Sequence, residues 1–180
     1  MNYRTLFGTL TKNEKVEKIP FDPKWSGGAP IPFLLQSELR TFLTYYVEDI
    51  DPNWDGTYVK VQDPTSPEVN KIAIVEWQRC RGASLGGLND EAIHGHKLWD
   101  KGLSECGYGA GIVKNSRWIE ELKMANRVHE YHKDEMFDVL NHYILIFHDT
   151  TFECIAKSFT VEVVNDSMPN VLNYVVEKLT

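Results

Sequence analysis

The sequence predicts an α+β protein with a mostly antiparallel sheet of five to seven strands and helices packed mainly on one side. Short segments rich in β-branched and aromatic residues recur along the chain, and turn-forming residues separate them. Helical spacing of apolar residues is confined to a few stretches. The 180 residues are expected to form a single domain over 1–180, with a wrapped N-terminal arm at 1–36 and a main body at 37–180.

Residues 20–32 of the arm are predicted to lack regular structure. Residues 12–19 are mostly charged, so we expect them to be exposed. Residues 20–32 are interrupted by four prolines and two glycines, which disfavour both helices and strands. Phe21 and Trp25 are the large apolar residues of this stretch, and we expect them to anchor the arm on the main body.

Three strands are predicted in the first half of the main body. Residues 40–47 are rich in aromatic and β-branched residues, although a helix beginning at Ser37 is an alternative. Residues 57–62 alternate between apolar and polar side chains, which is typical of a strand. Residues 71–79 alternate most clearly, and we expect them to form a central strand with antiparallel neighbours.

The middle of the chain is predicted to be mainly loop and helix. Residues 81–91 form a glycine-rich loop, and a short helical piece is expected to follow it and to end at Gly102. Asn115 or Ser116 can cap a helix that runs to about residue 128. A second short helix is expected at 134–140.

The C-terminal third predicts a hairpin, a strand and a helix. Two apolar, β-rich runs at 142–147 and 151–156 flank a turn at 148–150. Residues 159–164 alternate as a further strand. Asp166 or Ser167 then precedes an amphipathic helix with a proline in its first turn.

Charge and cysteine content exclude several classes of protein. The net charge of −7 argues against binding to nucleic acid or to an anionic membrane surface, because both need a positive field. No apolar run approaches the roughly 20 residues of a membrane span, and no secretory signal is visible. Three widely spaced cysteines predict free thiols in a reducing compartment. We therefore expect a cytoplasmic protein whose partner is another protein or a small molecule.

The densest polar cluster follows the predicted central strand, within residues 81–96. A His-x-His pair, His94 and His96, can present two imidazoles to one divalent metal ion, and a neighbouring carboxylate can act as a third ligand or as a base. The alternative is that these histidines satisfy backbone carbonyls in a long loop. The candidate side chains of this segment are Arg81, Asn89, Asp90, Glu91, His94 and His96.

The turn of the predicted hairpin adds a second pair, His148 and Asp149. A carboxylate beside an imidazole can orient it as a base, whereas the alternative is that Asp149 only stabilises the turn. We expect any functional pocket to lie between residues 81–96 and this turn, because a long ordered loop after a rigid strand is often functional.

Three segments of the chain resemble a group of small bacterial proteins of unknown function. These segments are Asn89-Asp90-Glu91 with His94-Gly95-His96, then Asn115-Ser116-x-Trp118-Ile119, and then Phe147-His148-Asp149-x-Thr151-Phe152-Glu153-Cys154. The resemblance covers roughly residues 70–164. It implies that the three segments belong to one module, and it implies no activity.

Two functional hypotheses follow. The first is a non-enzymatic binding or regulatory protein, such as an accessory or immunity-type partner, because the sequence contains no recognisable catalytic motif. The second is a small metal-dependent or histidine-based hydrolase in which His94, His96, His148 and Asp149 meet in one cleft. The spatial arrangement of the three histidines distinguishes between them.

Overall fold

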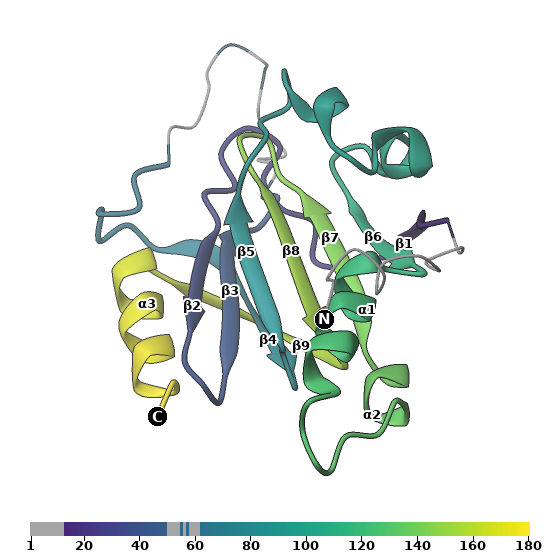
Figure 1. Cartoon of the computed structure of the whole chain (residues 1–180). Helices are drawn as coiled ribbons and strands as arrows, with labels where there is room; N and C mark the ends of the chain where they lie inside the picture. Colours follow the sequence, from purple (N-terminus) through teal and green to yellow (C-terminus); the bar gives the residue numbers. More distant parts are fainter. Residues whose placement is uncertain (1–12, 50–54, 56, 58–61) are drawn as a thin grey trace.

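The computed structural model describes residues 13–49, 55, 57 and 62–180, and in this part the strands form two antiparallel sheets (Figure 1). The five-stranded sheet has the order β1-β6-β7-β8-β5, with β1 at Lys15–Ile19, β6 at Ala110–Lys114, β7 at Asn141–Ile146, β8 at Thr151–Ala156 and β5 at Gly82–Gly86. The four-stranded sheet has the order β2-β3-β4-β9, with β2 at Phe33–Gln36, β3 at Thr41–Tyr46, β4 at Asn70–Gln78 and β9 at Ser158–Asp166.

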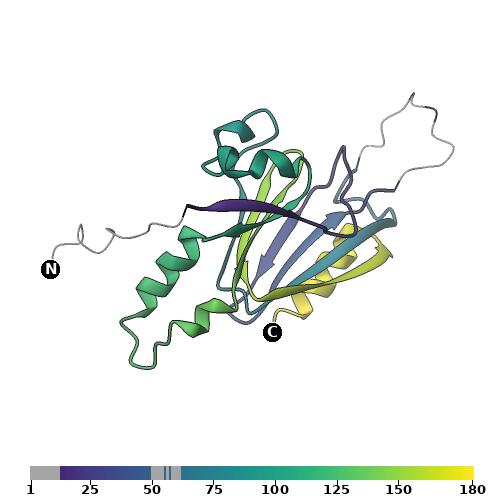
Figure 2. The same ribbon diagram turned by 90° about the vertical axis from the view of Figure 1, so that its right-hand side faces the viewer.

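Helices cover both outer faces of this pair of sheets (Figure 2). They are α1 at Arg117–Asn126, α2 at Glu135–Asp138 and α3 at Met168–Glu177, with short 3₁₀ helices at Ile93–Gly95, Trp99–Lys101 and Leu103–Cys106. Helix α3 packs on the four-stranded sheet, whereas α1 and the 3₁₀ helices pack on the five-stranded sheet. None of the helices in the described ranges has the length and apolar run needed to cross a bilayer.

The prediction of one sheet with helices mainly on one side is therefore corrected. Strand β4 explains why: Ile72 and Ile74 face α3, while Val75 and Trp77 on the opposite face belong to the cluster between the sheets. A strand whose two faces are both buried needs a packed layer on each side. Here α3 covers one face of β4, and the second sheet covers the face that a single sheet would expose to solvent. The coarser prediction, an α+β fold, is confirmed.

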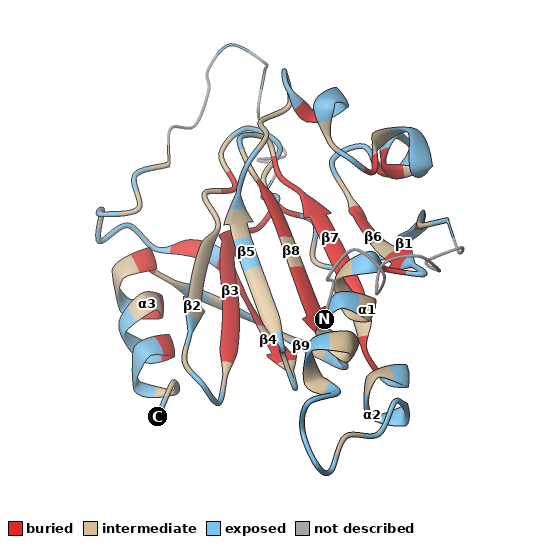
Figure 3. Ribbon diagram, viewed as in Figure 1, coloured by how far each residue is buried: buried red, intermediate tan, exposed pale blue. Residues whose placement is uncertain are grey.

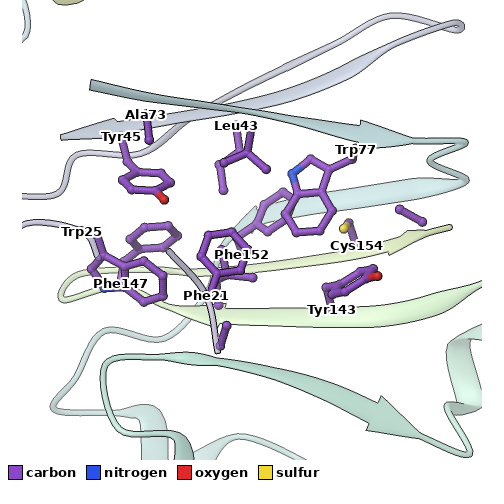
Figure 4. Close-up of a cluster of buried hydrophobic side chains, with 14 of the residues drawn as sticks. Phe21, Trp25, Leu43, Tyr45, Ala73, Trp77, Tyr143, Phe147, Phe152 and Cys154 are labelled. Carbon is purple, nitrogen blue, oxygen red and sulfur yellow. The ribbon is translucent and has the colours of Figure 1, made fainter. Parts of the chain in front are cut away.

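The main core lies between the two sheets (Figure 4). Trp77 from β4 lies 5.2 Å, centroid to centroid, from Phe152 of β8, and both side chains are buried. Phe21 and Trp25 also pack into this core, so the prediction that they anchor the N-terminal arm is confirmed. Trp25 is 4.6 Å from Phe147 by ring centroids, which fastens residues 20–32 to the end of β7.

Two further apolar clusters lie on the outer faces of the two sheets. The inner strands of each sheet are therefore buried on both faces (Figure 3). On the five-stranded sheet, Ile144 and Ile146 pack against Leu98 and Leu103 of the helical connection after β5. We call this connection, residues 88–106, the 88–106 segment. Its apolar residues convert one outer face of the sheet into a third packed layer.

Most predicted elements are present, with small differences at their ends. Strands β3, β4, β7, β8 and β9 occupy the predicted positions, and the first and last α-helices begin after Ser116 and Ser167. Each of these serines accepts a hydrogen bond from the backbone three residues on, at 3.3 and 3.4 Å. The predicted strand at 57–62 falls largely outside the described residues.

One local prediction was wrong and two were incomplete. The charged stretch 12–19 is mostly exposed in its described part, as predicted, but it also forms edge strand β1, which is stabilised by pairing with β6. The glycine-rich loop 81–91 contains β5, which pairs with β8. The short helix predicted at 134–140 is present as α2 and is a single turn. In the first two cases a partner strand that is distant in sequence determines the conformation.

Candidate functional site

The 88–106 segment is held on the five-stranded sheet at the turn between β7 and β8. The backbone N–H of Asp90 donates to the carbonyl of His148 at 3.0 Å. The hydroxyl of Thr151, at the start of β8, donates to the carbonyl of Leu88 at 3.4 Å. The expected proximity of this loop to the hairpin turn is thus present in the structure.

A group of four side chains forms at this contact, and we call it the rim cluster: Asp90, Tyr108, His148 and Asp149. His148 lies between the two carboxylates, with Nδ1 3.0 Å from Asp149 Oδ1 and Nε2 3.5 Å from Asp90 Oδ2. Tyr108 donates to Asp90 Oδ2 at 3.0 Å, and its ring stacks on that of His148 with 5.9 Å between centroids. The hydrogen bond to Asp149 raises the pKa of His148, and the hydrogen bond to Asp90 raises the pKa of Tyr108.

A second polar group lies deeper, on the outer face of the same sheet, and we call it the relay: Ser116, His142, Glu153 and His96. The Ser116 hydroxyl is 2.8 Å from His142 Nδ1, and His142 Nε2 is 2.9 Å from Glu153 Oε2. The other carboxylate oxygen of Glu153 is 3.4 Å from His96 Nε2. Ser116 and His142 are buried, and Glu153 and His96 are nearly so.

Strand alternation places the relay. Tyr143 of β7 and Phe152 and Cys154 of β8 point into the core between the sheets, so His142 and Glu153 point to the outer face. The edge of the Trp118 indole covers the His142 ring, with 5.3 Å between centroids and 86° between planes. Helix α1 therefore covers the relay, and the 88–106 segment closes it through His96.

The low pKa of Glu153 determines which atoms donate to its carboxylate. Burial by itself raises the pKa of Glu153, but hydrogen bonds from His142 and His96 outweigh it and hold that pKa well below its ordinary value. An ionised Glu153 only accepts, so Nε2 of each histidine carries a proton. In the tautomer that carries its single proton on Nε2, His142 can accept from the Ser116 hydroxyl at Nδ1, which gives the donor order Ser116 to His142 to Glu153.

This order is the same as in a serine–histidine–carboxylate triad, with the roles of the two ring nitrogens exchanged. The hydroxyl of Ser116 is polarised by a base at the N-terminus of α1, an arrangement that favours nucleophilic chemistry in principle. The same hydroxyl accepts from Ile119 N–H as the helix cap, and Ser116 is only 4 % exposed. In this conformation the relay therefore acts first as a structural clamp between α1 and the sheet.

The sequence-predicted residues divide between several environments. Asp90 meets His148 and Asp149 in the rim cluster, as described above. His96 instead turns into the relay, and its Nδ1 accepts from the backbone N–H of Leu98 at 3.2 Å. His94 is exposed and lies beside Trp99. His94, His96 and His148 thus do not share one cleft.

The remaining predicted side chains take part in neither group. Asn89 accepts from the backbone N–H of Ala92 at 3.2 Å and stabilises the local turn. Glu91 and Arg81 are exposed. Among the described residues, the histidines, cysteines and carboxylates that come close enough to hold one ion together are Asp90, His148 and Asp149. The predicted metal ligands His94 and His96 are not part of that set.

Sequence reasoning did not identify the relay. Its sequence signal is the presence of His142 and Glu153 at outward positions of two otherwise apolar strands, where an ionisable side chain needs a partner. Ser116 was identified only as a helix cap. That these three residues come together depends on the β6-β7-β8 register and on α1 folding back over it.

A cavity of about 590 Å³ lies beside the rim cluster, between residues 18–27 and the turn at 106–110. His148 and Tyr108 form part of its wall, and Trp25 forms part of its apolar side. The indole Nε1 of Trp25 is buried and has no hydrogen-bond acceptor among the residues that the structure describes. The cavity therefore has an apolar side next to charged and polar side chains.

Neither a protein-family model nor a curated protein or solved structure matches this chain.

Proposed function

We propose that this chain is a non-enzymatic binding protein whose ligand is a small zwitterionic molecule with an apolar body, bound in the cavity beside the rim cluster. The observation that carries the proposal is the lining of this cavity of about 590 Å³: apolar and aromatic surface together with charges of both signs. Its volume is in the range of pockets that hold small ligands.

The charges of the lining are balanced and available. Lys18 and Lys24 contribute ammonium groups, and Asp22 and Glu48 contribute carboxylates. Within the described ranges none of these four side chains forms an ion pair or a hydrogen bond. A ligand carboxylate would pair with Lys18 or Lys24, while a ligand ammonium group would pair with Asp22 or Glu48.

A concentration series of L-phenylalanine and of the dipeptide Leu-Phe tests the proposal by thermal unfolding and calorimetry. A ligand that binds only the folded state raises Tm with concentration. We expect one molecule bound per chain, and we expect Lys24→Gln to weaken binding by about tenfold, equivalent to about 1.4 kcal/mol. Lys133→Gln, at an exposed position that does not line the cavity, is the matched control.

Binding that is equally strong in both variants would place the ligand elsewhere. If neither probe raises Tm, the zwitterionic class is excluded for this cavity.

A second candidate function is a hydrolase, and the donor order of the relay favours it. Ser116, His142 and Glu153 supply a hydroxyl, a base and an orienting carboxylate, so the candidate differs from the cleft of His94, His96, His148 and Asp149 expected from the sequence. An opening of α1 would be required, because Ser116 is buried.

A fluorophosphonate probe distinguishes this candidate. Labelling that depends on Ser116, that is lost in His142→Gln and that persists in Ser167→Ala would support it. Absence of labelling in the wild-type chain, with the fold intact by circular dichroism, would exclude it in favour of the structural clamp.

A further inference from the structure

Three members of the rim cluster have the composition of a metal site. Asp90 comes from the 88–106 segment, whereas His148 and Asp149 come from the turn between β7 and β8. One ligand atom from each residue lies within 4.8 Å of the other two. The backbone hydrogen bond from Asp90 to His148 holds the two chain segments together. The backbone therefore keeps the side chains of Asp90 and His148 close to each other.

One imidazole nitrogen and two carboxylate oxygens are ligands that first-row divalent cations accept. Metal–ligand bonds of about 2.0–2.2 Å require the ligand atoms to approach one another further than they do without an ion. Asp149 can make this movement by side-chain rotation, because 76 % of its side chain is exposed. With a neutral imidazole the three ligands carry a charge of about −2, which a divalent cation balances.

Neighbouring groups would support the ion. The Tyr108 hydroxyl donates to Asp90 Oδ2 at 3.0 Å and so orients that carboxylate, which is the usual role of groups that hydrogen-bond to metal ligands. The stacked Tyr108 ring restricts rotation of the His148 imidazole. His148 also lines the cavity, so a remaining coordination position would be accessible from it.

We propose that Asp90, His148 and Asp149 bind one divalent transition-metal ion of the zinc class. This site differs from the His94–His96 pair suggested by the sequence, and it does not depend on the identity of the cavity ligand. The competing interpretation is that the three residues form only ion pairs centred on a protonated His148.

Calorimetric titration of the full chain with ZnCl₂, after removal of metal by a chelator and dialysis, tests the proposal. We expect one ion per chain, with Asp90→Asn and Asp149→Asn each weakening binding by about tenfold or more, equivalent to about 1.4 kcal/mol. His148→Gln is expected to remove measurable binding. Tyr108→Phe keeps the stacked ring but loses the hydroxyl, and we expect a loss of about tenfold.

His94→Gln is the matched control, because His94 is an exposed histidine of the same segment outside the site. Unchanged affinity in this variant and lost affinity in His148→Gln would together support the site. The proposal is overturned if the wild-type chain binds no Zn²⁺, if His148→Gln binds as well as wild type, or if His94→Gln is the variant that loses binding. Circular dichroism of each variant shows that lost binding does not come from unfolding.

Discussion

The hydroxyl of Ser116 and Nδ1 of His142 are 2.8 Å apart, although 26 residues separate them in the chain. This bond joins the residue before α1 to the second residue of β7, whose side chain points to the outer face of the sheet. Ser116 is at the same time the cap of α1, through Ile119 N–H. One hydroxyl therefore satisfies a helix terminus and a buried imidazole together, and its loss should affect both.

We predict that Ser116→Ala destabilises the protein more than Ser167→Ala does. Both serines are 4 % exposed and both cap a ten-residue helix, but among the residues that the structure describes Ser167 has no histidine partner. Loss of a cap costs about 1 kcal/mol. A buried acceptor left without its donor costs about 1–3 kcal/mol more, so urea unfolding should show a larger loss for Ser116→Ala. Equal losses in the two variants would mean that the bond to His142 contributes nothing.

We predict that Glu153 contributes to the loss of stability in acid. Its pKa is held below the unfolded-state value of about 4.3, so its contribution is complete above that pH and is lost progressively as the pH falls below it. In Glu153→Gln the free energy of unfolding should be lower by about 1–3 kcal/mol at pH 7 and should depend less steeply on pH below about 4. Glu121→Gln, at an exposed position on α1, is the control and should retain the wild-type slope. Parallel pH profiles for all three proteins would contradict the assigned protonation state.

We predict that Cys80 is the reactive thiol. The hydrogen bond from the Cys154 thiol lowers the pKa of Cys80 to about 6, while burial raises the pKa of Cys154 and of Cys106. Because the thiolate is the nucleophile, iodoacetamide at pH 7 should modify Cys80 first, with a rate that is half-maximal near pH 6. Peptide mass spectrometry identifies the site. In Cys154→Ala the rate profile should move to higher pH, and in Cys106→Ser it should not move.

We predict that truncating Phe152 to alanine costs about 3–5 kcal/mol, because its ring is fully buried between the two sheets. Ile146→Ala, on the outer face of the same hairpin, should cost about 2–5 kcal/mol. Val128→Ala is the control, since Val128 is 93 % exposed and should change the free energy of unfolding by less than about 0.5 kcal/mol. A loss below about 1 kcal/mol for Phe152→Ala in denaturant titration would contradict the burial of that ring.

Local patterns predicted the elements whose residues carry their own signal. The β7–β8 hairpin, β4 and α3 combine clear periodicity with turn or cap residues at their ends. Strand β5 was missed because three of its five residues are glycine or alanine, and its conformation depends on pairing with β8. The division into two sheets was missed because alternation along β4 shows that both faces are apolar and does not show what covers each face.

The sequence predicted the part of the rim cluster in which Asp90 meets the turn at His148 and Asp149, because both segments could be located from the sequence. The approach of Asp90 to the turn at His148 was expected from a long loop after the central strand, and in the structure it follows from β5, which pairs with β8 and ends beside that turn. The separation of His94 from His96 does not follow, because it depends on how a 3₁₀ helix rotates the two side chains. Glu153 finds His142 through strand register, which a single sequence does not specify.

The attachment of the 88–106 segment has a consequence for its dynamics. In the described part of the chain, the backbone hydrogen bonds of this segment are internal, apart from the one from Asp90 to His148. It can therefore detach from the sheet without breaking any strand pairing. Detachment requires that the buried contacts of Leu98 and Leu103 with the sheet, the Thr151–Leu88 hydrogen bond and the side-chain contacts of Asp90 and His96 are all released together. The amide protons of its 3₁₀ helices should then exchange with solvent as one cooperative unit, at a lower free energy than those of β7 and β8.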